Sequence, residues 1–196
     1  MILKIVPGGA FVENTYILQS KNSKELILVD PGSQTLEIEE SLSDLSFTSI
    51  HIWNTHGHLD HAYGADYFIK KYKANFNIHK KEIPILQAMT TAASRFGIPE
   101  FSDAVVPKID NFIEEEKQYE VGNLNFKTLL VPGHSPGSIC FHFTRELNPE
   151  EGLEEDLMIC GDTVFAGSVG RVDLTGGTNM EELLGNIAKK ILTLKE

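Results

Sequence analysis

The sequence predicts an α/β fold of one domain, with two packed β-sheets and helices on their outer faces. At 196 residues, of which 41% are hydrophobic, the chain is long enough to bury a sizeable core. Short apolar runs of strand length alternate with amphipathic segments of helical period. We find no internal repeat, linker or low-complexity tract. We therefore expect residues 1–196 to form a single domain.

Five strands and two helices are expected in the first 80 residues. Short β-branched or aromatic runs predict the strands, at 2–6, 16–18, 26–29, 50–53 and 76–78. A first helix is expected at 36–45, after the turn residues 30–33. A second is expected from about 61 to 72, where apolar residues recur at helical spacing.

The rest of the chain predicts a helical excursion, three strands and a last helix. Residues 82 to about 113 are expected to be helical with loops. Within them, 85–113 form either a lid that places Phe96 and Phe101 over a cleft, or a segment that packs both rings in the core. Strands are expected at 125–131, 138–143 and 157–160. Thr178 and Glu181 resemble a capping box at the start of the last helix.

Residues 55–61, Thr-His-Gly-His-Leu-Asp-His, hold three imidazoles and one carboxylate between a predicted strand and a predicted helix. A turn at this place can aim several side chains at one point, as metal binding requires. Imidazole and carboxylate together suit zinc, iron or manganese. A single histidine is more often a core or surface residue than a ligand, but this combination predicts a metal site.

Two further loops offer ligands at the ends of predicted strands. His134 lies in a Gly/Pro-rich turn after one strand, and Asp162 follows Gly161 after another. Alone, His134 could equally be a turn residue, and Asp162 would more often be a turn or helix-cap residue. Metal sites assembled from several strand-end loops tend to be catalytic, because loops leave a coordination position open.

Residues 29–32, 55–61, 132–137 and 161–173, with Gly176-Gly177, carry a family resemblance. The chain resembles metallo-β-lactamase-superfamily hydrolases, in particular the small bacterial glyoxalase II-like (hydroxyacylglutathione hydrolase-like) proteins. The resemblance implies a four-layer αββα sandwich of two mixed sheets with outer helices. This fold hosts many reactions, so the resemblance specifies the superfamily better than the substrate.

The resemblance also implies a ligand set. His56, His58 and His134 would hold a first metal, Asp60 and His61 would hold a second, and Asp162 would bridge both. We expect zinc at the two positions, with iron or manganese also suited. Asp60 is expected to be catalytic as well.

Two residues outside the ligand set have both a functional and an ordinary interpretation. By resemblance, Asp30 would orient a ligand histidine, although a turn residue here could instead cap the next helix. Arg171, nine positions after Asp162, matches a basic residue that contacts the thiol carrier in glyoxalase II-like proteins, but it could instead pair with Asp173.

The family's last ligand is a histidine in a turn beyond the final helix. No histidine follows His142 in this chain, so we expect the domain to lack the C-terminal end of the fold. We therefore expect the second metal position to be weakly occupied or empty.

The leading function is a metal-dependent hydrolase that cleaves a thioester, such as an S-hydroxyacyl thiol, by attack of a metal-bound hydroxide. Two alternatives remain: a mononuclear iron persulfide dioxygenase of the same superfamily, and a catalytically impaired metal-binding member. A β-lactamase or a nuclease is less favoured, since we see neither an export signal nor a basic surface.

The composition of the chain limits which classes of partner it could bind. The formal charge of −11 disfavours nucleic acid and anionic membranes. A small-molecule thioester is the partner that the resemblance implies. We see no signal peptide or membrane span, and we expect a cytoplasmic protein. Cys140 and Cys160 lie in apolar runs and are expected to be buried free thiols. The sequence does not indicate an oligomeric state.

Overall fold

The computed structural model describes residues 1–194, apart from the side chain of Phe96. Its first sheet has six strands in the order β1-β2-β3-β4-β5-β6. These are β1 (Ile2–Gly8), β2 (Glu13–Gln19), β3 (Glu25–Val29), β4 (Ser49–Trp53), β5 (Asn75–His79) and β6 (Asn111–Ile113). The first three strands pair antiparallel, whereas β3 to β6 run parallel, so this sheet is mixed.

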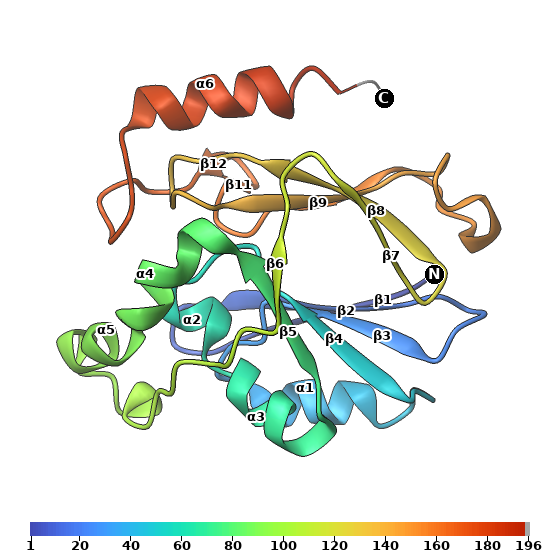
Figure 1. Cartoon of the computed structure of the whole chain (residues 1–196), viewed down its shortest axis with the longest axis horizontal. Coiled ribbons are helices and arrows are strands. Elements are labelled where there is room, and N and C mark those ends of the chain that lie inside the picture. The colour runs from blue at the N-terminus through green and yellow to red at the C-terminus, as the bar shows by residue number, and fades with distance from the viewer. Residues whose placement is uncertain (195–196) are drawn as a thin grey trace.

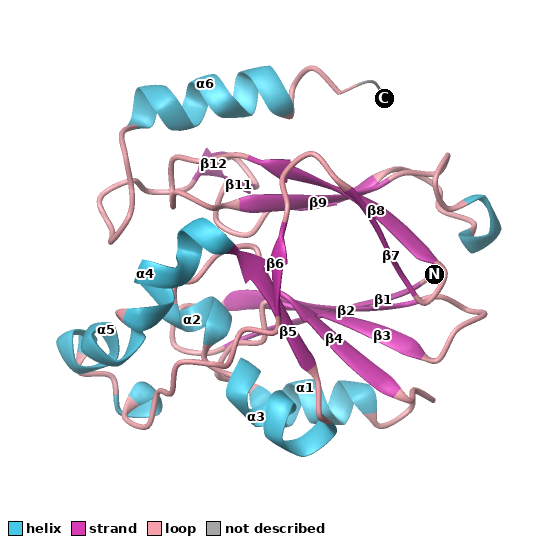
Figure 2. Ribbon diagram, viewed as in Figure 1, coloured by secondary structure: helices cyan, strands magenta, loops and turns pink. Residues whose placement is uncertain are grey.

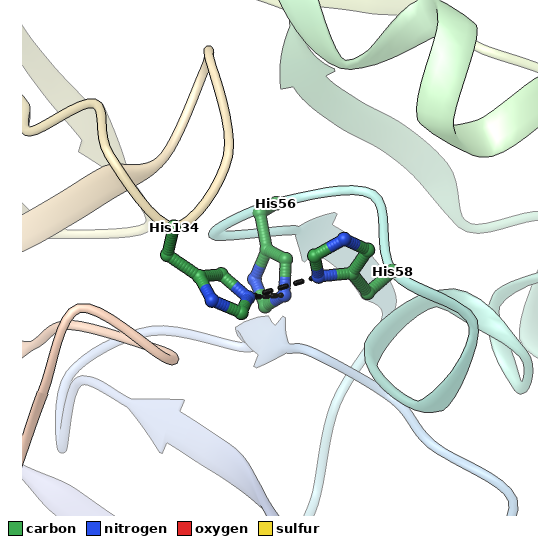
Figure 3. Close-up of side chains that lie close together, drawn as sticks. All are labelled: His56, His58 and His134. Carbon is green, nitrogen blue, oxygen red and sulfur yellow. Dashed lines mark hydrogen bonds between the residues drawn. The ribbon is translucent and has the colours of Figure 1, made fainter. Parts of the chain in front are cut away.

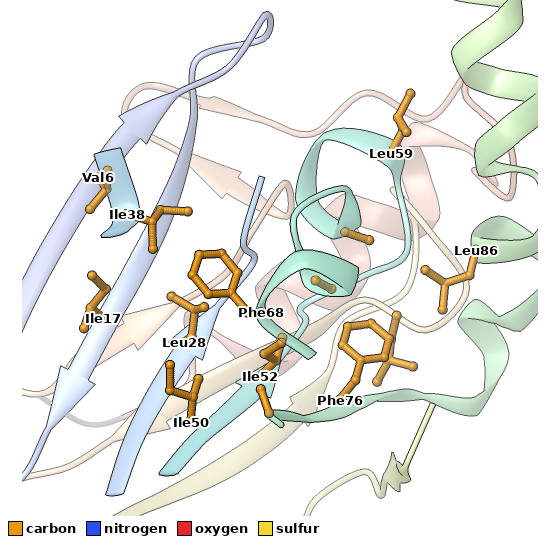
Figure 4. Close-up of a cluster of buried hydrophobic side chains, with 14 of the residues drawn as sticks. Val6, Ile17, Leu28, Ile38, Ile50, Ile52, Leu59, Phe68, Phe76 and Leu86 are labelled. Carbon is orange, nitrogen blue, oxygen red and sulfur yellow. The ribbon is translucent and has the colours of Figure 1, made fainter. Parts of the chain in front are cut away.

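Parallel neighbours need crossover connections, and helices supply them. Helices α1 (Thr35–Leu42) and α3 (Ala65–Tyr72) lie on the outer face of the first sheet, at the bottom of Figure 1. Their apolar stripes pack on alternate residues of the strands, among them Leu28, Ile50 and Ile52 (Figure 4). This packing forms the largest hydrophobic cluster and fixes where the carboxyl ends of the parallel strands lie.

The second sheet has four strands in the order β10-β9-β8-β7, all antiparallel. They are β7 (Gln118–Val121), β8 (Leu124–Leu130), β9 (Ile139–Phe143) and β10 (Leu157–Ile159). A small hairpin of β11 (Val164–Phe165) and β12 (Ser168–Val169) follows β10. Helix α6 (Met180–Lys190) covers the outer face, as Figures 1 and 2 show.

The layers are therefore helix, sheet, sheet, helix. A second core joins the two sheets, where Trp53 contacts Phe126 and Phe141 edge to face. A third core lies between the second sheet and α6, around Leu183 and Ile187. The predicted αββα sandwich is confirmed, although its second sheet is antiparallel throughout rather than mixed.

Several element boundaries differ from the prediction because of contacts that are distant in sequence. The helix expected from 61 to 72 is two helices, α2 (Leu59–Ala62) and α3. The break is at Gly64, whose N–H donates to the Pro31 carbonyl and where a Cβ would lie 2.2 Å from the Gly32 oxygen. Helix α6 begins one residue later than the capping box suggested, because Asn179 rather than Thr178 caps it.

The excursion after β5 is only partly helical. It contains a 3₁₀ turn (Lys80–Glu82), α4 (Ile83–Gln87), α5 (Met89–Phe96) and a second 3₁₀ turn (Pro99–Phe101), and the chain then enters β6. Phe101 is 1% exposed and packs in the first core, so the alternative of a lid residue is wrong for it. The side chain of Phe96 lies outside the described part of the chain.

Among the described residues, none of the helices has the length and apolar character needed to cross a bilayer.

Candidate metal centre

The histidine-rich segment is a tight loop between β4 and α2. His56 and His58 lie in the loop, while His61 lies on α2. The Asn54 side chain donates to the carbonyls of His56 and His61, at 3.3 and 2.8 Å, and so draws the two ends of the loop together. The loop therefore presents several imidazoles to one small volume.

Two other loops reach the same volume from the second sheet. His134 follows β8, and Asp162 follows β10. Fully buried Glu82 ties the first loop to the His134 loop, since it accepts from Gly57 N at 2.8 Å, Gly137 N at 2.6 Å and Ser135 Oγ at 2.8 Å. Burial raises the pKa of Glu82 despite these hydrogen bonds.

Sequence reasoning missed Glu82. Its three partners are 25 to 55 positions away in the chain, and a single glutamate before an apolar helix resembles any first-turn acid. Thr55 was also missed as a functional residue, although it begins the histidine motif.

Three imidazole nitrogens converge in the middle of these loops (Figure 3). His134 Nε2 lies 2.9 Å from His58 Nδ1 and 3.2 Å from His56 Nε2. Ligands at 2.0–2.1 Å from one tetrahedral ion would be about 3.3 Å apart, so this spacing fits a metal ion.

The outer nitrogen of each ring has a fixed partner. His58 Nε2 donates to the Thr175 carbonyl at 3.1 Å, and His134 Nδ1 donates to the Arg171 carbonyl at 2.8 Å. His56 Nδ1 lies 3.0 Å from Thr55 Oγ1, whose own proton goes to Asp30. With the protons on the outer nitrogens, three lone pairs face one point, which is favourable only around a cation.

The three rings are held in the neutral form, which is the protonation state of metal-binding histidines. Burial, followed by the neighbouring imidazoles, holds the pKa of His56 well below its ordinary value. Burial and the His134 ring lower the pKa of His58 to about 4, and burial lowers that of His134 as well. Neutral imidazole is the form that binds a metal.

A second group of donors lies beside the first. Asp162 Oδ1 is 3.1 Å from His61 Nε2, and its Oδ2 is 3.5 Å from His134 Nε2, so this carboxylate lies between the two groups. Asp60 Oδ2 is 3.7 Å from His61 Nε2. Among the described residues, buried His61 Nε2 makes no hydrogen bond of good geometry and faces these two carboxylates, a set of donor atoms that suits a shared cation.

Charge at this second group favours a cation. Burial acts to raise the pKa of Asp162, but His61 and then His134 outweigh it and hold that pKa at about 2. Burial acts to lower the pKa of His61, yet the carboxylates of Asp60 and Asp30 raise it well above its ordinary value. Without a metal ion, a proton on His61 balances the surrounding carboxylates, and a bound cation would take the place of that proton.

Asp30 also belongs to a close group of potential ligands, with His56 and His61. Its oxygens are already used, because they accept from Thr55 N at 2.7 Å, Thr55 Oγ1 at 2.6 Å and His61 Nδ1 at 3.0 Å. The next helix, α1, begins after Gln34, and Asp30 does not cap it. The contacts of Asp30 are those of a residue that orients His61.

A cavity of about 610 Å³ opens over the second donor group. His58, Asp60, His61 and Asp162 lie on its floor. Apolar residues also line it, among them Phe11 and Val12 before β2 and Ile85, Ala88, Met89 and Ala92 from the α4–α5 segment. Helices α4 and α5 therefore help to line the cavity, whereas Phe101 does not line it and packs in the first core.

Arg171 lies at the edge of this cavity. Its guanidinium binds Asp173 with two contacts, Nε to Oδ1 at 2.6 Å and Nη2 to Oδ2 at 2.7 Å. The ion pair that the sequence left open is therefore formed, and a role of Arg171 in binding substrate stays a prediction. Separately, the backbone carbonyl of Arg171 accepts a hydrogen bond from His134 Nδ1.

Comparisons with known proteins agree with this geometry. The sequence matches the Metallo-beta-lactamase superfamily over residues 8–195. It is 31% identical over 191 residues to the probable metallo-hydrolase YqgX of Bacillus subtilis, covering 97% of this chain and 84% of that protein. It is 28% identical over 204 residues to the hydroxyacylglutathione hydrolase GloC of Haemophilus influenzae, covering all of this chain and 87% of that one.

Two solved structures are similar over nearly the whole chain. The B3 metallo-beta-lactamase BLEG-1 superposes with a TM-score of 0.79 at 30% identity, covering 100% of this chain and 88% of that one. A di-iron-bound form of TTHA1623 superposes with a TM-score of 0.76 at 25% identity, covering 98% and 87%.

Proposed function

The chain belongs to the metallo-beta-lactamase superfamily of metallo-hydrolases, and we propose that it hydrolyses a thioester, such as an S-hydroxyacyl thiol, at two adjacent metal positions. One observation carries the proposal. Three imidazoles with fixed outer nitrogens point their inner nitrogens at one place, and Asp162 lies between them and His61.

The donors divide into two sets. His56, His58, His134 and one oxygen of Asp162 would hold the first ion, and His61, Asp60 and the other oxygen of Asp162 would hold the second. Bound divalent ions would supply a Lewis acid that polarises a carbonyl and acidifies water. Zinc fits these nitrogen and oxygen donors, as do iron and manganese.

The protein's own groups orient the donors and shape the approach. Asp30 and Thr55 fix the ring orientations of His61 and His56, and Glu82 holds two of the ligand loops in register. The apolar lining from α4 and α5 would seat an acyl group and keep bulk water from it.

The thioester is favoured by the similarity to GloC and by this apolar lining beside the donors. To test it, metal content is measured and the protein is reconstituted with zinc, iron or manganese. Each form is assayed with an S-hydroxyacyl thioester, a β-lactam and a persulfide in the presence of oxygen. Thioester hydrolysis with two ions supports the proposal. Oxygen consumption with one iron would replace it by a persulfide dioxygenase, and β-lactam cleavage alone by a β-lactamase.

Zinc titration of apo-protein is expected to give two unequal binding steps. The first position has three imidazoles and a carboxylate oxygen, whereas the second has one imidazole and two carboxylates among the described residues. We expect the first step to be tighter by roughly ten-fold or more, the scale on which changes around a metal alter its affinity. His61→Ala should remove only the weaker step, and two equal steps in the unaltered protein would contradict this assignment.

Substitutions at Arg171 and Asp173 are expected to have opposite effects on a glutathione thioester. Their ion pair is exposed and screened by water, so a substrate carboxylate can replace Asp173. Arg171→Ala should raise KM several-fold with kcat nearly intact, whereas Asp173→Asn should lower KM because it frees the guanidinium. The thioester of a neutral thiol should respond little to either change. Equal losses of kcat with both substrates would mean that Arg171 is structural.

A further inference from the structure

The two cysteines, which are the only thiols in the sequence, face each other across neighbouring strands. Strands β9 and β10 are antiparallel and pair Met158 with His142 and Ile159 with Phe141. One more step along this register places Cys160 opposite Cys140. Opposite residues of an antiparallel pair project to the same face, and both lie in the cluster beneath α6. Directly opposite residues of such a pair have Cβ atoms roughly 4.5–5.5 Å apart, so the two side chains lie next to each other.

This placement satisfies the geometric requirement of a disulfide. Opposite residues on antiparallel strands have Cα atoms roughly 4.5–5.5 Å apart, depending on their place in the ladder. Disulfides join Cα atoms roughly 4.4–6.8 Å apart, so the bond could form with little movement of the backbone. Both thiols are free in the structure.

A small oxidant can reach only one of the two sulfurs directly. Cys160 is partly exposed and lines the cavity that contains the metal donors. Cys140 is fully buried. The pair therefore has an accessible member and a shielded member in contact with it, an arrangement suited to a two-step oxidation.

We propose that Cys140 and Cys160 are a dithiol that hydrogen peroxide oxidises to a disulfide, and that this oxidation weakens metal binding in the same cavity. The Cys160 sulfur attacks the peroxide, the O–O bond breaks, and water leaves with the proton of the thiol, so that Cys160 becomes a sulfenic acid. The Cys140 sulfur then attacks the Cys160 sulfur and a second water leaves. Two thiols and one peroxide thus give one disulfide and two waters, with two electrons transferred to the peroxide.

The link to the metal centre runs through the turn after Cys160. Gly161 has φ +49°, and a Cβ there would lie 2.2 Å from Thr55 Oγ1, so the backbone of this turn packs directly on Thr55. Thr55 in turn holds the ring of His56 and the carboxylate of Asp30. Asp162 follows Gly161. An S–S bond of about 2.05 Å draws the two sulfurs closer together than two thiols can lie. Because the turn packs so tightly on Thr55, even a small displacement of Cys160 would reach Asp162 and the partners of two ligand histidines.

The test uses the zinc-loaded, reduced full chain, treated with hydrogen peroxide. Free thiols are then alkylated and counted by mass spectrometry, and released zinc is followed with a chromophoric chelator. We expect both thiols to disappear together in a monomeric chain that is 2 Da lighter. Zinc affinity should fall by roughly ten-fold, as for other changes around metal ligands, and a dithiol reductant should restore it.

Cys140→Ala and Cys160→Ala are the matched controls, with folding checked by circular dichroism under reducing conditions. In Cys140→Ala, peroxide should oxidise Cys160 to a sulfinic or sulfonic acid or link two chains through Cys160. Monomeric Cys140→Ala should then show no change in zinc affinity that a dithiol reductant reverses. The proposal is overturned if the thiols of the unaltered protein react independently, if they stay free while the fold is intact, or if the disulfide forms without a change in zinc affinity. None of these readouts depends on the substrate.

Discussion

Asp162→Asn is expected to lower kcat/KM for a thioester by about 10³-fold or more and to remove roughly one metal ion per chain. The two oxygens of Asp162 face different donor groups, at 3.1 Å from His61 Nε2 and 3.5 Å from His134 Nε2. An asparagine has nearly the same shape but carries one acceptor oxygen and no charge. The asparagine could therefore offer an acceptor oxygen to only one donor group, and its amide N–H₂ would face the other group.

The measurements are elemental analysis of the purified variant and steady-state kinetics at equal protein concentration. Asp44→Asn is a suitable control, because Asp44 lies on the surface beside Lys4 and far along the chain from the donors. It should keep both the metal content and kcat/KM. If Asp162→Asn retained two ions and full activity, Asp162 would not lie between two metal positions.

The local part of the candidate site could be predicted from the sequence, because it is contained in seven consecutive residues. Two histidines that alternate along the chain just before a helix lie in the same turn, however the rest of the chain folds. The structure brings His134 and Asp162 to the same turn because the second sheet packs face to face with the first. Neither residue alone carries a signal in sequence that separates a ligand from an ordinary turn residue.

The supporting residues could not be predicted, since their contacts join distant segments. Glu82 accepts hydrogen bonds from Gly57 and Gly137, and no local pattern relates these positions. The break at Gly64 has the same cause, because the Gly64 N–H donates to the distant Pro31 carbonyl and the nearby Gly32 carbonyl leaves no room for a Cβ. The short strands β6 and β7 were missed because three and four residues are too few to separate a strand from a loop, although Gln118–Val121 does alternate polar and apolar residues.

Asp30→Ala is expected to weaken zinc binding at the His61 position by about 10- to 100-fold and to destabilise the apo-protein by roughly 2–4 kcal/mol. Asp30 is fully buried, and its loss leaves Thr55 N–H, the Thr55 hydroxyl and His61 Nδ1–H without their acceptor. The His61 ring would then be free to turn its Nε2 away from Asp162. Asp30 also has φ +49°, a conformation that aspartate and asparagine tolerate better than alanine, which adds to the loss of stability.

Two comparison variants separate orientation of the ligand from general stability. Asp30→Asn keeps the backbone conformation and one acceptor oxygen, so it should recover much of the stability but little of the zinc affinity. Asp110→Ala removes the acceptor of the Phe76 N–H, away from the donors, so it should lower stability and leave zinc affinity unchanged. Denaturant unfolding of the apo-proteins and competition with a zinc chelator give the two quantities. If Asp30→Ala and Asp110→Ala behaved alike in both measurements, Asp30 would stabilise the fold without orienting His61.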